Sequence, residues 1–145
     1  MSTTSREDKM KVQKISAILV MIIGAVFVVS GAVTYNMVHT KLVAEKITVS
    51  EDSPKYAGKS VAGPFTAYQQ ADMISHHALK ATGGKTYAEL DREDPLRVVA
   101  MNGSFLRASL FTSVVSFGLS AFVMGVGAVC MLVGYSLLGL VKRQA

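Results

Sequence analysis

Charged positions along this chain are confined to three blocks, which are separated by two runs without any charge. The first charge-free run, Ile15–Val38, has 24 residues, and the second, Ala108–Val141, has 34. A helix needs about 20 predominantly apolar residues to cross the hydrocarbon core of a bilayer. A chain of 145 residues has too little other material to bury two such helices in a soluble core. The pattern therefore predicts an all-α membrane protein, a hairpin of two transmembrane helices over 15–38 and 108–141.

The segment between the runs, 39–107, is predicted to be a mainly helical loop of about 70 residues. The first membrane helix is expected to continue to about Lys46, and Ile47–Val49 has the composition of a short β-type run. Residues 50–64 are rich in Pro, Gly and Ser, which predicts an irregular connection. A helix is predicted over 65–82, because a proline precedes it and a glycine pair follows it.

A second short helix is predicted over 86–93, because Thr86 and Glu89 have capping-box spacing. Asp94-Pro95 is typical of an N-cap followed by a first-turn proline, so a long helix is expected to start there. That helix has a candidate break near Asn102-Gly103-Ser104 before it enters the membrane. Its 34 uncharged residues would extend about 51 Å against a core of about 30 Å, so it should tilt or protrude.

The distribution of basic residues predicts the orientation in the membrane. The two tails, 1–14 and 142–145, hold six Lys and Arg in 18 residues, whereas 39–107 holds nine that are nearly balanced by eight acids. Basic residues are enriched on the cytoplasmic side of membrane helices. Both termini are therefore expected in the cytoplasm and the loop outside the plasma membrane, and the net charge of +5 does not indicate nucleic-acid binding.

The first run also has features of a secretory signal peptide, with Ser30-Gly31-Ala32 as a candidate cleavage site. The run is long for such a peptide, which favours an uncleaved membrane helix. The single cysteine, Cys130, lies inside the second run, so no disulfide within the chain can stabilise the loop.

The histidine pair His76-His77 is the first candidate for chemistry. Adjacent residues on a helix point about 100° apart, so the two rings are poorly placed to share a metal ion. Asp72 and His76 have the four-residue spacing of a ligand pair, and His39 or the acidic cluster would have to supply a third ligand. A non-haem iron site needs two histidines and a carboxylate. The spacing favours a solvated His76 and a His77 at a packing edge, and no metal or other cofactor is predicted.

Two further motifs are interpreted as structural. Gly84-Lys85-Thr86 matches the end of a phosphate-binding loop, but Leu79 stands where the first glycine is needed and a helix precedes the motif instead of a strand. The stretch 91–94, which contains three acidic residues and Arg92, favours a solvated turn, with a partner-docking patch as the alternative.

The two runs lack the ionisable groups that transporters and proton pumps bury in the membrane. Both contain small residues at helical spacing, which lets two helices approach closely. The packing partner could be the other span, a second copy or a different protein. The candidate helix-packing residues are Ala17, Gly24 and Gly31 in the first run and Gly118, Ala121 and Gly125 in the second.

Three segments resemble a family of small actinobacterial two-span membrane proteins: ITVSEDSPKYAGKSVAGPFTAYQQAD, ATGGKTYAELDREDPLR and NGSFLRASLFTSVVSFG. The resemblance covers roughly Ile47 to Gly118. Many family members are labelled as an aromatic ring-opening dioxygenase, which the histidine geometry here does not support. The resemblance implies an accessory subunit of the actinobacterial supercomplex of cytochrome bc and cytochrome oxidase.

The expected function is therefore that of a non-catalytic accessory subunit in the respiratory chain, with lipid and other membrane subunits as partners. One alternative is a metal-dependent oxygenase that uses Asp72 and His76. Another is an envelope or lipid-binding protein that acts through its external loop.

Overall fold

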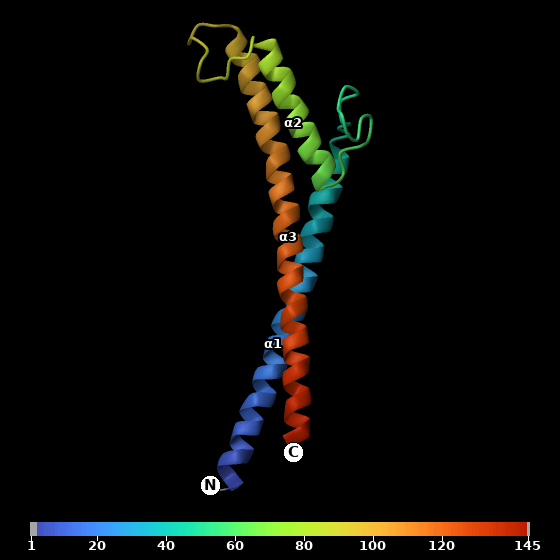
Figure 1. The fold of residues 1–145 in the computed structure, drawn as a ribbon, viewed down its shortest axis with the longest axis vertical. Coiled ribbons are helices and arrows are strands. Elements are labelled where there is room, and N and C mark those ends of the chain that lie inside the picture. The colour runs from blue at the N-terminus through green and yellow to red at the C-terminus, as the bar shows by residue number, and fades with distance from the viewer. Residues whose placement is uncertain (1–2, 145) are drawn as a thin grey trace. The chain divides into compact units, whose positions relative to one another are not determined.

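The computed structural model describes residues 3–144, and its regular secondary structure over that range is helical, joined by irregular connections (Figure 1). It contains α1 (Thr3–Ala44), α2 (Pro64–Ala81) and α3 (Leu96–Gln144). The described residues form no strand, and the β-type run Ile47–Val49 makes only an isolated bridge between Thr48 and Ser60. The all-helical class is thus confirmed.

Two helices are long and apolar enough to cross a membrane. The qualifying segments are Glu7–Ala44 in α1 and Leu96–Arg143 in α3. Only 17% and 11% of their most apolar windows are buried, so most of their apolar side chains are exposed. The core helix of a soluble protein would hide most of this surface. These helices instead have the exposed apolar surface that a lipid environment requires.

The chain divides into two compact units. The span unit comprises the described parts of Met1–Thr34 and Leu119–Ala145, and the loop unit comprises Tyr35–Gly118. The span unit contains the larger part of α1 and the C-terminal half of α3. The loop unit contains the last turns of α1, all of α2 and the first turns of α3.

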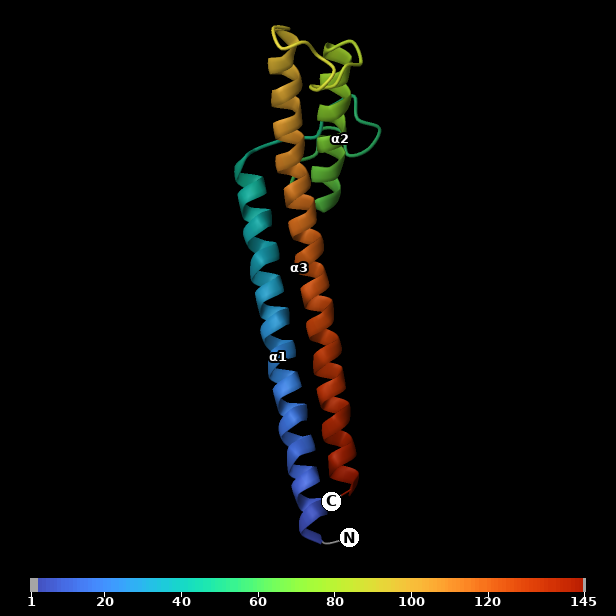
Figure 2. The same ribbon diagram turned by 90° about the vertical axis from the view of Figure 1, so that its left-hand side faces the viewer.

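In the loop unit, α2 packs alongside the first turns of α3 (Figures 1 and 2). A small core joins the three helices with the connection 45–63. Its buried members come from each of these segments: Leu42, Val49, Val61, Ala67, Ala71, Leu110 and Phe117. Tyr35 adds a ring contact with Phe117, at 4.7 Å between centroids.

The ends of α2 follow the local sequence signals. Pro64 occupies its first turn, and the hydroxyl of Thr66 accepts hydrogen bonds from the backbone N–H groups of Ala62 and Gly63, at 3.1 and 3.2 Å. After the helix ends, Gly83 and Gly84 have φ angles of +65° and +86°, a region that glycine adopts without strain. The observed α2 begins and ends within one residue of the predicted bounds, 65–82.

The predicted helix at 86–93 is wrong, since these residues form turns. The capping contact itself is present, because the N–H and hydroxyl of Thr86 both donate to the Glu89 carboxylate, at 2.8 and 2.7 Å. The Arg97 guanidinium, however, donates a hydrogen bond to the carbonyl oxygen of Leu90, at 2.7 Å. It also lies 4.0 Å from the centre of the Tyr87 ring. Eight residues are too few to nucleate a helix without a packed face, so these contacts decide the conformation.

The candidate break at Asn102-Gly103-Ser104 does not form, and α3 continues through it. A Cβ added at Gly103 would lie 2.7 Å from the Cβ of Ala78 on α2. The glycine therefore serves the close approach of α2 to α3, not a bend. Residues 3–14, predicted as a tail before the first span, are also helical, since they contain neither glycine nor proline.

Candidate functional site

The first candidate site is the contact between α1 and α3 in the span unit. Gly24 and Gly31 are buried, and Ala17 is completely buried. A Cβ added at Gly24 would lie 2.6 Å from the carbonyl oxygen of Gly127, and one at Gly31 would lie 2.8 Å from that of Ser120. Real Cβ atoms essentially never come this close to backbone. The three predicted residues of the first run therefore lie where the two backbones approach most closely.

The matching face of α3 consists of Ser120, Gly127 and Gly134, all of which are buried. A Cβ added at Gly134 would lie 2.7 Å from the carbonyl oxygen of Ala17. These residues recur every seven positions, as do Ala17, Gly24 and Gly31 on α1. Small residues at matched heptad spacing on both helices are typical of close helix packing in membranes.

The predicted packing residues of the second run occupy a different face. Gly118, Ala121 and Gly125 are exposed, and a Cβ at either glycine would have no neighbour within 4 Å. Position 120 lies two residues after 118, which is about 200° around a helix. The span of α3 thus carries small residues on two nearly opposite faces, and only one of them contacts α1.

The sequence contained a signal that separates these two faces. The stripe that includes Gly118 and Gly125 is interrupted by Leu132, whereas Ser120, Gly127 and Gly134 continue without interruption. An uninterrupted stripe is needed when backbones stay in contact over several turns, because one large residue would push the helices apart.

The second candidate site is the set of polar contacts that attach the connection 45–63 to the helices of the loop unit. Gln70 accepts hydrogen bonds from the N–H and hydroxyl of Ser50, at 2.9 and 3.3 Å. His39 donates from Nδ1 to the carbonyl oxygen of Ala62 at 2.6 Å. These contacts fix the connection against both α1 and α2.

The third contact of this set joins His77 to Asp52, with 2.7 Å between Nε2 and Oδ2. Hydrogen bonding from His77 is the main cause that holds the pKa of Asp52 below its ordinary value. Both side chains are exposed. The expected packing-edge histidine is thus observed as the partner of a carboxylate.

His76 lies beside His77, with 6.1 Å between the ring centres and an interplanar angle of 58°. Within residues 3–144, no three His, Cys, Asp or Glu side chains gather closely enough to hold a metal ion. Asp72 and His76 line a shallow open depression on α2. Asp52 also lines this depression, but it is paired with His77. His39, a predicted third ligand, does not line it and is bonded to the carbonyl of Ala62.

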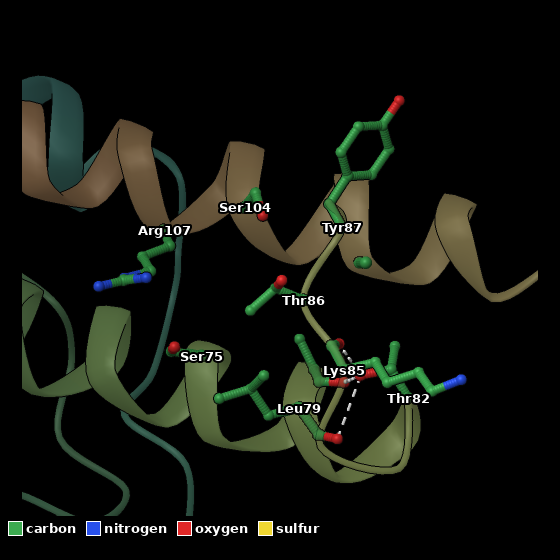
Figure 3. Close-up of a pocket in the computed structure, with 10 residues that line it drawn as sticks. Ser75, Leu79, Thr82, Lys85, Thr86, Tyr87, Ser104 and Arg107 are labelled. Carbon is green, nitrogen blue, oxygen red and sulfur yellow. Dashed lines mark hydrogen bonds between the residues drawn. The ribbon is translucent and has the colours of Figure 1, made fainter. Parts of the chain in front are cut away.

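Lys85, Thr86 and Tyr87 line one side of a small cavity between α2 and α3 (Figure 3). Its volume is about 100 Å³, which is enough for about three water molecules at liquid density. The Thr82 hydroxyl lies 3.1 Å from the carbonyl oxygen of Ala78 and also contacts that of Lys85. The segment Gly83–Thr86 therefore ends α2 and forms a turn. The adjacent cavity is too small for a nucleotide.

The described residues therefore offer packing faces on the span helices and a polar framework around α2. In comparisons with known proteins, no family model, curated protein or solved structure matches this chain.

Proposed function

We propose that this chain is a non-catalytic accessory subunit of a larger membrane complex. In this proposal α1 and α3 cross the plasma membrane over 15–38 and 108–141, with both termini in the cytoplasm and the loop unit outside. The basic tails support this orientation, because they hold six Lys and Arg in 18 residues.

The exposed second face of α3 is the observation that carries the proposal. Ala121, Gly125 and Gly139 are exposed, and nothing lies within 4 Å of a Cβ at either glycine. Contact with α1 already occupies the opposite face. A membrane helix gains from small residues when another helix approaches, because association in lipid depends on close packing. The second face is therefore suited to a helix of another subunit.

The complex we propose is the respiratory supercomplex of cytochrome bc and cytochrome oxidase. The resemblance over Ile47 to Gly118 supports this assignment, as does the lack of Asp, Glu, His, Lys and Arg along both charge-free runs. The loop unit would dock on the outer surface of the complex while the exposed face of α3 packs within the bilayer.

The proposal is tested by affinity capture of the tagged, natively expressed chain in mild detergent, followed by mass spectrometry. We expect cytochrome subunits at stoichiometric yield. A chain that is extracted from the membrane fraction but captured alone would refute the assignment to a complex.

A matched pair of variants tests the exposed face itself. Gly125→Leu should reduce capture of the partner by about tenfold, because a bulky side chain on a packing face costs roughly 1–3 kcal/mol. Val133→Phe adds bulk eight residues on, about 80° around the helix, and should leave capture unchanged. Equal loss in both variants would count against a specific face.

A further inference from the structure

The loop unit also contains a groove that none of the sites described above occupies. It lies between the end of α1, α2 and the first turns of α3, and its volume is about 700 Å³. This is within the range of about 300–1,000 Å³ typical of small-molecule sites. Its floor includes Leu42 and Leu110, both almost fully buried, and Ile74 of α2 forms part of its wall.

The groove follows α1 from an apolar end at Met37 to a charged end at Glu45. Leu42 and Leu110 provide apolar surface between these ends, and Lys41 lines the groove one residue before Leu42. The charges of Lys41 and Glu45 are one helical turn apart, about 6 Å along the axis. Both are exposed, and the ion pairs of residues 3–144 do not include either. One cation and one anion are therefore available to a ligand at the same rim.

Hydroxyl groups of α3 line the groove between these ends. Ser109 is exposed there, one turn before Ser113. The hydroxyls of Thr112 and Ser113 donate to the backbone carbonyls of Ala108 and Ser109, at 2.9 and 3.4 Å. Within residues 3–144 the Ser109 hydroxyl makes no hydrogen bond, so it can donate to an ester oxygen.

The position of the groove matches the surface of the bilayer, an argument that rests on the proposed function. Val38 ends the first charge-free run and Ala108 begins the second. The groove extends across both of these boundaries, from Met37 to Ile47 and from Phe105 to Ser116. Its apolar end would thus face the acyl chains of the outer leaflet, and its charged end the headgroups.

We propose that this groove binds one zwitterionic aminophospholipid, of the phosphatidylethanolamine type. The phosphate pairs with Lys41, the ammonium with Glu45, and one acyl chain lies along Leu42 and Leu110. A lipid with a net negative headgroup would place uncompensated charge beside Glu45. The opposite charges at the rim thus select a headgroup that carries both signs.

Native mass spectrometry of the full chain in detergent tests this, with phosphatidylethanolamine and phosphatidylglycerol added in parallel. We expect one bound phosphatidylethanolamine and at least about tenfold weaker binding of phosphatidylglycerol, as charge-assisted hydrogen bonds imply. Equal binding of the two lipids, or no binding of either, would overturn the proposal.

Two pairs of variants locate the site. Ser113→Trp fills the groove and should abolish binding, whereas Val115→Trp, at an exposed position of the same helix outside the groove, should not. Glu45→Lys should reverse the preference toward phosphatidylglycerol. Circular dichroism checks that each variant is folded. Retained binding in Ser113→Trp, or an unchanged preference in Glu45→Lys, would refute the site.

The outcome is distinguishable from that of the proposed function. A chain that binds the aminophospholipid but is captured without cytochromes would leave the groove assigned and the accessory role refuted. If Ser113→Trp instead reduces capture of a protein partner while lipid binding persists, a protein occupies the groove and the lipid proposal is wrong.

Discussion

In the span unit α1 and α3 meet through their backbones, whereas in the loop unit the helices meet through side chains. Gly24 and Gly127 allow carbonyl oxygens to lie where a Cβ would otherwise be. The loop unit instead buries Leu42, Val49 and Val61 around α2. The difference is the one expected if, as proposed above, the span unit lies in lipid and the loop unit in water, because lipid gives no hydrophobic driving force for burying apolar side chains and water does.

The largest effect should come from removing a core side chain of the loop unit. Leu42→Ala should lower the free energy of unfolding by about 3 kcal/mol, because it loses buried surface and leaves a cavity. Thermal unfolding of the detergent-solubilised chain measures this. Val43→Ala, at the neighbouring and 40% exposed position, should cost much less. Similar losses in both would show that the core is not the stabilising feature.

Adding a side chain should be the damaging change in the span unit. Gly24→Leu should destabilise the contact of α1 with α3 by about 2 kcal/mol, because its Cβ would overlap the backbone at Gly127. Unfolding in increasing dodecyl sulfate measures the change. Gly125→Leu is the matched control and should be nearly neutral in the isolated chain, since nothing lies within 4 Å of that position. The reverse ranking would contradict the assigned face.

The cap of α2 should contribute a smaller amount. Thr66→Val removes the acceptor for the N–H groups of Ala62 and Gly63 and should cost about 1 kcal/mol. Thr40→Val is the control, since that hydroxyl only donates to the carbonyl of Asn36 within its own helix. Amide hydrogen exchange should increase at the start of α2 in the first variant alone.

The smallest effect concerns the exposed pair of Asp52 and His77. The lowered pKa of Asp52 means that the pair stabilises the fold above the ordinary value of 3.8 and that this is lost as pH falls through the lowered pKa. Carboxyl NMR should show titration of Asp52 below 3.8, and His77→Ala should return its pKa toward 3.8. His76→Ala should shift it less, because His76 contributes only a minor charge interaction. An unchanged pKa in His77→Ala would refute the pairing.

The helices could be predicted from the sequence, whereas contacts between segments that are distant in the sequence could not. The charge-free runs and the signals around Pro64 and Gly83-Gly84 predicted the helices correctly, because each depends on neighbouring residues. The helix at 86–93 was predicted from a capping pattern that is present, yet Arg97 binds the carbonyl of Leu90 and the segment forms turns.

The same limit applies to the candidate site. Ala17, Gly24 and Gly31, which form a small-residue stripe at heptad spacing on α1, lie in the contact with α3. α3 has two such stripes, and the choice between the stripe of Gly125 and that of Gly127 depends on the partner helix. The close approach of Gly103 to Ala78 likewise could not be predicted from the residues around Gly103. The glycine was therefore interpreted as a helix break.

The backbone contact at Gly24 and Gly127 has a consequence for mutational tolerance. Glycine is the smallest residue, so every substitution at these positions adds a Cβ about 2.6 Å from a carbonyl oxygen of the facing helix. On the exposed side, Val26 and Val129 can exchange with Ile or Leu at little cost, because more than half of each side chain is exposed. Random mutagenesis should therefore find the two longest helices permissive over most of their circumference and intolerant along one narrow line.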